Sequence, residues 1–344
     1  MLLLAQVTMG AQERGMQNIR ETLEKRQVSV YFVAVFIAVL TALLARGTAA
    51  LEYWINPALA IMLFATFLHV PLVDLGRAFT RGRFIAALLI SNFIAVPLLV
   101  TVLVQFLPPE PLVRLGVLLV LLTPCIDYVV TFAHLGRADA RVLLAATPTL
   151  LVVQMLLLPF YLGLLLGNNA AILVQPGPFV DAFVWLIAVP FSLAGAVQLW
   201  AARSRVGERL SSALGLLPVP ATAVVLFIVV AAVLPQLGPA THVALRVIPP
   251  YVAFAAIAPL IGWSIGRVFR LDPRAGRAVA FSAGTRNSLV VLPLALAVPG
   301  AVPILPAVIV TQTLVELIGE LLYVRLIAKL GGTESRTATL SADA

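Results

Sequence analysis

The sequence predicts an all-α polytopic membrane protein with ten transmembrane helices. We expect a five-plus-five inverted repeat whose discontinuous fourth and ninth helices cross at the midplane of the bilayer. Three observations favour this fold: a very apolar composition, ten long apolar runs, and polar interruptions at corresponding positions in two of those runs. The simpler alternative is ten helices in which proline and glycine fall by coincidence, because both residues are common in membrane helices.

The composition excludes a soluble globular protein and argues against nucleic acid as a partner. Of the 344 residues, 61% are hydrophobic and only 11% are charged, which is far from the balance of a soluble domain. The net charge of +8 lies in short basic clusters between apolar runs, and this pattern is a signal of membrane topology. The lipid bilayer is therefore the expected partner of the chain.

The cysteine and histidine residues predict neither a metal site nor a cofactor. Cys125 is the single cysteine, so an intrachain disulfide and a zinc site with several cysteines are excluded. The three histidines, His69, His134 and His242, are too scattered in the sequence to predict the ligands of one metal.

Ten apolar runs divide the chain into two halves. Each run is long enough, or nearly so, to cross about 30 Å of hydrocarbon as a helix. The runs of the first half are residues 28–44, 55–75, 84–107, 112–134 and 142–166, and those of the second half are 179–201, 210–237, 243–265, 277–298 and 302–327. We therefore predict a first five-helix repeat over 28–166, an extracytoplasmic linker over 167–178, and a second repeat over 179–330.

The basic residues predict that both termini are cytoplasmic. If residues 1–27 form a cytoplasmic tail without a cleaved signal peptide, nearly all arginines and lysines between the runs fall on one side, together with a second tail at 331–344. The opposite side keeps only Arg46, Arg114 and Arg246. This asymmetry follows the positive-inside rule, and we expect a multi-pass protein of the cell inner, or plasma, membrane.

The fourth run is interrupted by the segment Thr123-Pro124-Cys125-Ile126-Asp127. Pro124 removes a backbone donor and crowds the carbonyl four residues back, so we expect the helix to break just before it. In a lipid core, freed backbone groups are tolerated only against protein or beside a wet cavity. Because ionisable groups at this depth are usually functional, we predict a substrate-binding site at Thr123, Cys125 and Asp127.

The ninth run is interrupted by the segment Ser282-Ala283-Gly284-Thr285-Arg286-Asn287-Ser288. The glycine loosens the helix, and Arg286 puts a full positive charge where lipid would reject it. Paired interruptions in corresponding helices of two halves are typical of the binding site of a secondary transporter. We therefore expect the two breaks to face each other. The predicted substrate-binding residues of the ninth run are Ser282, Thr285, Arg286, Asn287 and Ser288.

Ten helices with polar breaks in the fourth and ninth resemble the bile acid:sodium symporter superfamily, which includes the arsenical-resistance transporters that export arsenite. The run Thr123-Pro124-Cys125 is similar to the arsenical branch, in which a cysteine follows a proline in the fourth helix and contacts arsenic. The run Gly284-Thr285-Arg286-Asn287-Ser288 is similar to the ninth-helix motif Gly-x-Gln-Asn-Ser of the sodium symporters. The resemblance, closest to the arsenical branch, implies a secondary transporter.

The sequence departs from both branches at their ion-coupling residues. Where the sodium symporters have a glutamate two residues before the glycine, this chain has Ser282, and Arg286 replaces their glutamine. Losing a carboxylate and gaining a guanidinium turns a cation cage into a site that repels Na⁺. The arsenical branch has a glutamate three residues after the asparagine, where this chain has Val290. The resemblance therefore supplies neither coupling residue.

Arg286 and Asp127 are predicted to pair across the two breaks, because isolated charges in a low-dielectric core are costly. In one interpretation this pair only fastens the two broken helices, and Arg286 acts as a tethered replacement for sodium. In the other interpretation, Arg286 also binds an anionic substrate, or Asp127 takes up a proton during the transport cycle. The two interpretations are compatible.

Cys125 also has two interpretations. A lone buried cysteine is commonly a small apolar filler, whereas a reactive thiolate needs positive potential nearby, which Arg286 can supply. Because trivalent arsenic is thiophilic, one thiol beside the hydroxyls of Thr123, Thr285 and Ser288 can form a transient bond to it.

The last run contains a polar stripe. Gln312, Glu316 and Glu320 follow one another at intervals of one helical turn and therefore share a face. Glu316 and Gln312 are, with Asp127, the candidates for coupling through a proton path or an ion site. Glu320 lies close to Arg325, where solvent at the cytoplasmic end can reach it.

The favoured hypothesis is a secondary active transporter that works by alternating access and exports arsenite or a related metalloid. H⁺ is favoured over Na⁺ as the coupling ion, and the sequence has no Gly-x-x-x-x-Gly-Lys-Ser/Thr loop for ATP. The alternative is a sodium-coupled or sodium-independent transporter of a small organic anion or oxyanion held by Arg286. An integral-membrane enzyme is a remote alternative, because Asp127 has no carboxylate beside it in sequence to share a Mg²⁺ ion.

Overall fold

The computed structural model describes residues 2–68, 81–126, 128–167, 176–237 and 241–332. Within these ranges the chain is helical almost throughout, and the β-type pairing found there is an isolated bridge between Pro124 and Arg286. The prediction of an all-α protein is therefore confirmed for the described residues.

The helices of the first half follow the predicted apolar runs. They are α1 (Leu2–Leu44), η1 (Thr48–Trp54), α2 (Ile55–Phe67), α4 (Gly82–Ile90), the π-helical turn η4 (Ser91–Ala95), α5 (Val96–Val104), α6 (Pro111–Leu121), α7 (Tyr128–Leu135) and α8 (Ala140–Leu166). Pro111 is the first residue of α6, where its missing N–H removes no helical hydrogen bond.

The helices of the second half are separated by short connections. They are α10 (Pro176–Phe183), the π-helical turn η5 (Val184–Ala188), α11 (Val189–Ala201), α12 (Arg205–Leu214), α13 (Pro218–Val233), η6 (Leu234–Leu237), α14 (Thr241–Val268), α15 (Pro273–Gly284), α16 (Ser288–Leu296), α17 (Ile304–Leu326) and η7 (Ile327–Lys329). Asp272 caps α15 by accepting hydrogen bonds from the main-chain N–H groups of Arg274 and Ala275.

The first helix is longer than the span predicted for it. The tail predicted over residues 1–27 is helical from Leu2 and runs without a break into the apolar stretch that ends at Leu44. This stretch contains no proline, so nothing in the sequence stops the helix between the tail and the span.

Seven helices in the described part of the chain are long and apolar enough to cross a membrane. They cover Arg26–Leu44, Thr48–Phe67, Gly82–Val104, Ala140–Leu166, Arg205–Val233, Thr241–Val268 and Ile304–Lys329. Of the other predicted spans, the fourth and the ninth are each divided into two shorter helices at the polar break, and the sixth contains the shorter apolar helix Val189–Ala201. Length and composition thus indicate a multi-pass membrane protein.

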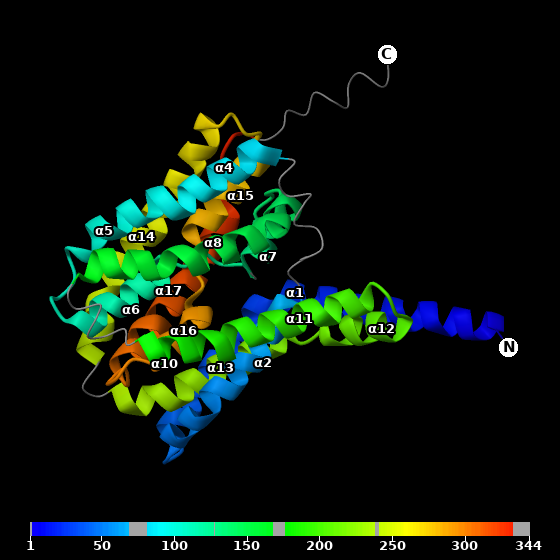
Figure 1. The fold of residues 1–344 in the computed structure, drawn as a ribbon, viewed down its shortest axis with the longest axis horizontal. Helices are drawn as coiled ribbons and strands as arrows, with labels where there is room; N and C mark the ends of the chain where they lie inside the picture. The colour runs from blue at the N-terminus through cyan, green and yellow to red at the C-terminus, as the bar shows by residue number, and fades with distance from the viewer. Residues whose placement is uncertain (1, 69–80, 127, 168–175, 238–240, 333–344) are drawn as a thin grey trace.

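The helices form two groups that lie side by side (Figure 1). The α13 group consists of α1, α2 and α10–α13, and the α15 group consists of α4–α8 and α14–α17. Each group takes elements from both halves of the chain, since α1 packs on α13 in one group and α5 packs on α14 in the other. Helix α16 lies where the groups meet, because it contacts α6 and α17 as well as α2 and α10.

Glycines let α15 pack deep within its group. A Cβ atom added at Gly262 of α14 would lie 2.7 Å from the main-chain oxygen of Val279 in α15. At Gly284, where α15 ends, an added Cβ would lie 2.7 Å from the Pro259 ring and 2.9 Å from the Tyr323 ring. Such close approach is typical of helix packing in membranes, and it places the break after α15 in the interior.

Candidate functional site

The two broken helices meet through their main chains. Helix α6 ends at Leu121 and α7 begins at Tyr128, while α15 ends at Gly284 and α16 begins at Ser288. We call the two connecting segments, residues 122–126 and 285–287, the crossing. The Cys125 N–H donates to the Thr285 carbonyl at 3.1 Å, and the Asn287 N–H donates to the Thr123 carbonyl at 2.9 Å. These two bonds form the antiparallel bridge between Pro124 and Arg286.

This bridge leaves three helix-end carbonyls without their usual partners. In an unbroken helix, the carbonyls of Leu121, Ser282 and Ala283 would accept from the N–H groups four residues further on. Those N–H groups are used elsewhere: Cys125 and Asn287 donate across the crossing, and Arg286 donates to a carboxylate oxygen of Glu316 at 2.8 Å. Buried carbonyls that lose their partners need new donors.

The guanidinium of Arg286 supplies those donors. Its Nη2 atom donates to the Ser282 carbonyl at 2.6 Å and to the Ala283 carbonyl at 2.8 Å, and its Nη1 atom donates to the Leu121 carbonyl at 3.3 Å. One side chain therefore caps the C-terminal ends of both α6 and α15. A cation is well suited to this position, because helix C-termini carry partial negative charge.

Two further contacts hold this fully buried guanidinium. Nη2 also donates to the side-chain oxygen of Asn92 at 2.8 Å, and the ring of Phe254 lies 5.4 Å from the guanidinium carbon. Asn92 stands in the π-helical turn η4, and its amide nitrogen donates to the Ser282 hydroxyl at 3.0 Å. A turn of this kind inside an α-helix often marks a functional position.

Helix α17 contributes two buried carboxylates beside the crossing. Glu316 accepts from the Arg286 N–H, from the Gln312 side-chain nitrogen at 2.5 Å, and from the Tyr128 hydroxyl. Glu320 is hydrogen-bonded to the Thr285 hydroxyl, and its second carboxylate oxygen has no hydrogen-bond partner among the described residues. Gln312 in turn accepts from the Ser288 hydroxyl, so α17 is tied to both sides of the ninth-run break.

The residues predicted from the sequence gather in one place. All nine that the structure describes are buried there, either in the two breaks or on the facing side of α17: Thr123, Cys125, Ser282, Thr285, Arg286, Asn287, Ser288, Gln312 and Glu316. Asp127 lies outside the described residues, so its pairing with Arg286 stays a prediction. No metal was assigned to these residues from the sequence.

Three residues of this cluster were not assigned to it from the sequence. Tyr128 follows the fourth-run break and begins α7, where its hydroxyl contacts Glu316. Asn92 is a polar residue within a long apolar run, and this pattern is the sequence signal that could have identified it. Glu320 was placed where solvent can reach it. That expectation is wrong, because its side chain is fully buried beside Thr285 of the crossing.

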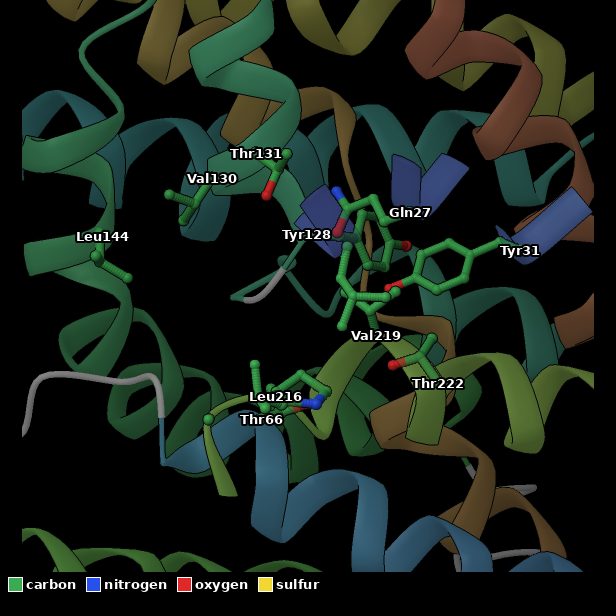
Figure 2. Close-up of a pocket in the computed structure, with 13 residues that line it drawn as sticks. Gln27, Tyr31, Thr66, Tyr128, Val130, Thr131, Leu144, Leu216, Val219 and Thr222 are labelled. Atoms are coloured by element: carbon green, nitrogen blue, oxygen red, sulfur yellow. The ribbon is translucent and has the colours of Figure 1, made fainter. Parts of the chain in front are cut away.

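A cavity of about 200 Å³ lies between the two helix groups, next to the crossing (Figure 2). Its polar lining residues are Gln27, Tyr31, Thr66, Tyr128, Thr131 and Thr222, and none of the lining residues in the described chain is charged. The Gln27 amide nitrogen and the Thr66 hydroxyl are buried there and have no hydrogen-bond partner among the described residues. Tyr128 lines the cavity and also contacts Glu316, so it joins the cavity wall to the buried cluster.

Comparison with known proteins identifies a family. The model of the sodium bile acid symporter family matches residues 56–238, which is more than half of the 344 residues. A search of curated proteins found no match. Members of the matched family are membrane transporters that move small molecules together with a coupling ion. The chain therefore belongs to the sodium bile acid symporter family.

Proposed function

We propose that the chain is a secondary active transporter that opens one site alternately to the two sides of the membrane. Its proposed substrate is arsenous acid or a related uncharged metalloid, and its coupling ion is H⁺. The observation that carries this proposal is the cavity between the two helix groups, which is lined by uncharged residues, both polar and apolar, and touches the crossing through Tyr128.

The proposed architecture is the ten-helix inverted repeat, with repeats over residues 28–166 and 179–330, the linker 167–178 on the outer side and both termini in the cytoplasm of a plasma-membrane protein. This proposal is supported by the two helix groups, because each group contains helices from both halves of the chain. The two broken helices would cross near the midplane. Rocking of one group against the other around a site at their interface is the motion expected of such a fold.

The neutral lining of the cavity favours an uncharged substrate. Arsenite is present near neutral pH chiefly as As(OH)₃, a small molecule that offers only hydroxyl groups. The Gln27 nitrogen and the Thr66 hydroxyl, which have no hydrogen-bond partner in the part of the chain that the structure describes, provide a donor and a donor-acceptor for such a ligand. An organic anion held by Arg286 is disfavoured, because that guanidinium is fully buried and its Nη atoms already donate to four protein oxygens.

Cys125 is the proposed thiol contact for arsenic. Its main chain holds the bridge to Thr285, and its side chain is buried within the crossing. The thiol does not belong to the lining of the cavity. Contact with a metalloid would therefore require the crossing to open toward the cavity during transport.

Glu316 is the proposed proton site, with Gln312 as its hydrogen-bond partner and Asp127 as a further candidate. Arg286, Glu316 and Glu320 bring two carboxylates but one cation into the same buried cluster. With both carboxylates ionised, one negative charge would be left unbalanced in a medium of low dielectric. A proton on one of the two carboxylates restores the balance.

The protonation state of Glu316 would change the hydrogen bonding of Tyr128 at the cavity wall. Its hydroxyl carries one proton but faces two oxygens, the Arg286 carbonyl at 3.0 Å and the Glu316 carboxylate. An ionised Glu316 must receive the tyrosine proton, whereas a protonated Glu316 can donate to the tyrosine, which then donates to the carbonyl. Because Tyr128 lines the cavity, the two states present different hydrogen-bonding groups to a bound substrate.

Arsenite flux into proteoliposomes tests the substrate. We expect flux above that of empty liposomes, and a loss of flux in Cys125→Ser if the thiol takes part. Unchanged flux in Cys125→Ser would remove the thiol from the mechanism. The organic-anion alternative would replace the metalloid hypothesis if two results are found together. The wild type would show no arsenite flux, and it would show a carboxylate flux that is lost in Arg286→Gln.

A pH gradient tests the coupling. We expect Glu316→Gln to lose gradient-driven accumulation while it keeps exchange of labelled substrate at equal pH on both sides. Glu52→Gln is a suitable control, because Glu52 is exposed on η1. Accumulation by Glu316→Gln at the wild-type level would exclude Glu316 as the coupling residue.

A further inference from the structure

We infer that the guanidinium of Arg286 is a built-in cation that takes the place of a bound sodium ion at the joined ends of α6 and α15. The inference follows from the oxygens that surround Nη1 and Nη2 of Arg286, three main-chain carbonyls and the Asn92 side chain. It concerns the resting protein and does not depend on the substrate or on the proton site proposed above.

The oxygens around the guanidinium form the kind of site that binds a hard cation. In transporters with discontinuous helices, unwound carbonyls and the C-terminal ends of half-helices coordinate Na⁺. Here the carbonyls of Leu121, Ser282 and Ala283 are such ends: the N–H partners of Leu121 and Ala283 donate across the crossing, and that of Ser282 donates to Glu316. Neutral oxygen ligands of this type suit a hard cation.

Nη2 occupies the centre of this site. It lies 2.6 Å from the Ser282 carbonyl, 2.8 Å from the Ala283 carbonyl and 2.8 Å from the Asn92 oxygen. A metal ion at the same point would have to displace a fully buried cation that is tethered to the chain. A sodium ion next to the guanidinium would be strongly repelled, because like charges repel strongly at short range in a medium of low dielectric. The site with Arg286 in place therefore excludes sodium.

The side chain at position 282 also points at this site. The Ser282 hydroxyl accepts from the amide nitrogen of Asn92, whose oxygen binds Nη2. A carboxylate at position 282 would therefore lie beside the cation. The chain has a neutral hydroxyl there, which is consistent with a site that already contains its positive charge. Assembly of the crossing then requires no sodium binding, although the family is named for sodium symport.

Thermal unfolding in matched salts tests this inference. Purified wild-type protein is compared in NaCl, KCl and choline chloride at equal ionic strength, alongside Arg286→Gln and the double variant Arg286→Gln with Ser282→Glu. Arg277→Gln is the matched control, because Arg277 is a buried arginine of α15 that, like Arg286, donates to main-chain carbonyls. Arg286→Lys keeps a tethered cation and should behave like the wild type.

For the wild type, Arg277→Gln and Arg286→Lys, we expect the unfolding temperature of each protein to be the same in all three salts. The three proteins can differ from one another in that temperature. The single and double variants that carry Arg286→Gln should gain about 2 °C for each tenfold rise in Na⁺ above its dissociation constant, with the larger response in the double variant. A variant with Arg286→Gln that folds in NaCl but not in choline chloride would also support the inference.

Two results would overturn the inference. The first is a sodium-specific rise in the unfolding temperature of the wild type, which is measurable whether or not any variant folds. The second is the absence of a sodium response in both variants that carry Arg286→Gln, including the case in which neither folds in any salt, because sodium then cannot replace the guanidinium. The salt dependence of unfolding can be measured whether or not the protein transports arsenite. The sodium inference and the proposed substrate can therefore be disproved independently.

Discussion

The two ends of α15 use the same chemistry in different surroundings. Near its start, the buried Arg277 donates to the carbonyls of Arg137 and Leu330 at 3.0 Å each and of Gly332 at 3.3 Å. Just past its end, Arg286 donates to three other carbonyls and to Asn92. In both places a guanidinium satisfies main-chain oxygens that belong to different segments.

The surroundings decide what each arginine does. Arg277 lines a cavity of about 500 Å³ together with His134, Arg137 and Arg274, so water and mobile ions can reach that end. Arg286 is fully enclosed and shares its cluster with Glu316 and Glu320. We conclude that Arg277 fastens α15 to its neighbours at a wet end, whereas Arg286 also sets the electrostatics of a dry site.

The largest effect is expected from Arg286→Leu. The substitution leaves three buried carbonyls without donors and leaves the two carboxylates of α17 without their cation. Because each orphaned buried group costs about 1–3 kcal/mol, we expect a loss of about 3 kcal/mol or more in unfolding free energy. Denaturation of the purified protein measures this loss. A variant as stable as the wild type would show that the helix ends find other donors.

Arg277→Leu should cost less, although it also removes donors from three carbonyls. Water from the neighbouring cavity can replace the lost hydrogen bonds, so we expect about 1–2 kcal/mol. The two arginine variants should be measured side by side in the same detergent. A larger loss in Arg277→Leu than in Arg286→Leu would reverse the distinction drawn between the two ends.

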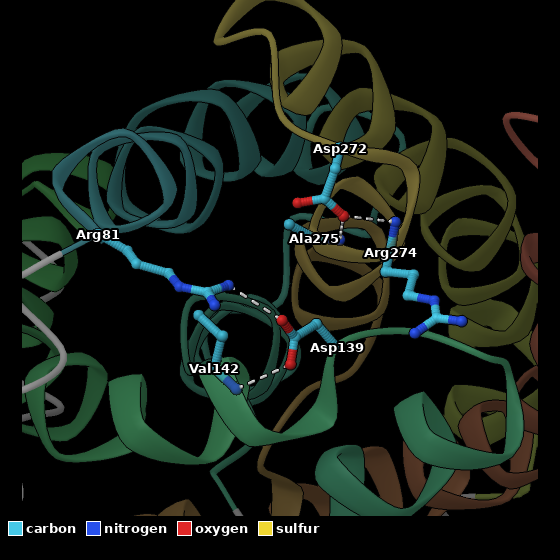
Figure 3. A network of polar contacts seen from close by, with 6 residues as sticks. All are labelled: Arg81, Asp139, Val142, Asp272, Arg274 and Ala275. Carbon is cyan, nitrogen blue, oxygen red and sulfur yellow. Dashed lines mark hydrogen bonds and ion pairs between the residues drawn. The ribbon is translucent and has the colours of Figure 1, made fainter.

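Asp272→Ala removes the N-cap at the same end as Arg277. The Asp272 side chain accepts from the main-chain nitrogens of Arg274 and Ala275 at 3.0 Å each (Figure 3). Loss of such a cap typically costs about 1 kcal/mol. Asp272→Asn, which can still accept these bonds, should retain most of the stability, and equal losses in both variants would exclude capping as the cause.

The smallest effect is expected from Arg81→Ala. Arg81 pairs with Asp139 at 3.1 Å (Figure 3), and the Asp139 N–H donates to the Arg274 carbonyl at the start of α15. The Arg81 side chain is 58% exposed, and exposed ion pairs contribute about 0–1 kcal/mol. We expect a change of unfolding temperature close to the error of the measurement. A loss as large as that of Asp272→Ala would show that the pair stabilises α15.

Much of this arrangement could be predicted from the sequence. Pro124 in one apolar run and Gly284 with Arg286 in another predicted two broken helices, because each contradicts a continuous helix in lipid. The burial of Arg286 followed from its place in an apolar run. The family resemblance pointed to the same two breaks, and the family match covers the first of them.

The partners of Arg286 could not be predicted in this way. Charge alone suggested Asp127, whereas the described contacts of the guanidinium are carbonyls and an amide oxygen. The carbonyls that lose their helical partners are set by the acceptors to which the N–H groups of the crossing donate. Those acceptors are known only from the folded main chain. The burial of Glu320 likewise depends on where Thr285, just past the end of α15, lies against α17, and helical spacing does not encode that placement.

Equilibrium binding of radiolabelled sodium to the purified wild-type protein tests the central claim most directly. Since the guanidinium of Arg286 already fills the oxygen site at the ends of α6 and α15, we predict only background binding, unchanged by excess unlabelled sodium. Saturable binding of sodium to the wild type, displaced by unlabelled sodium but not by choline, would contradict it.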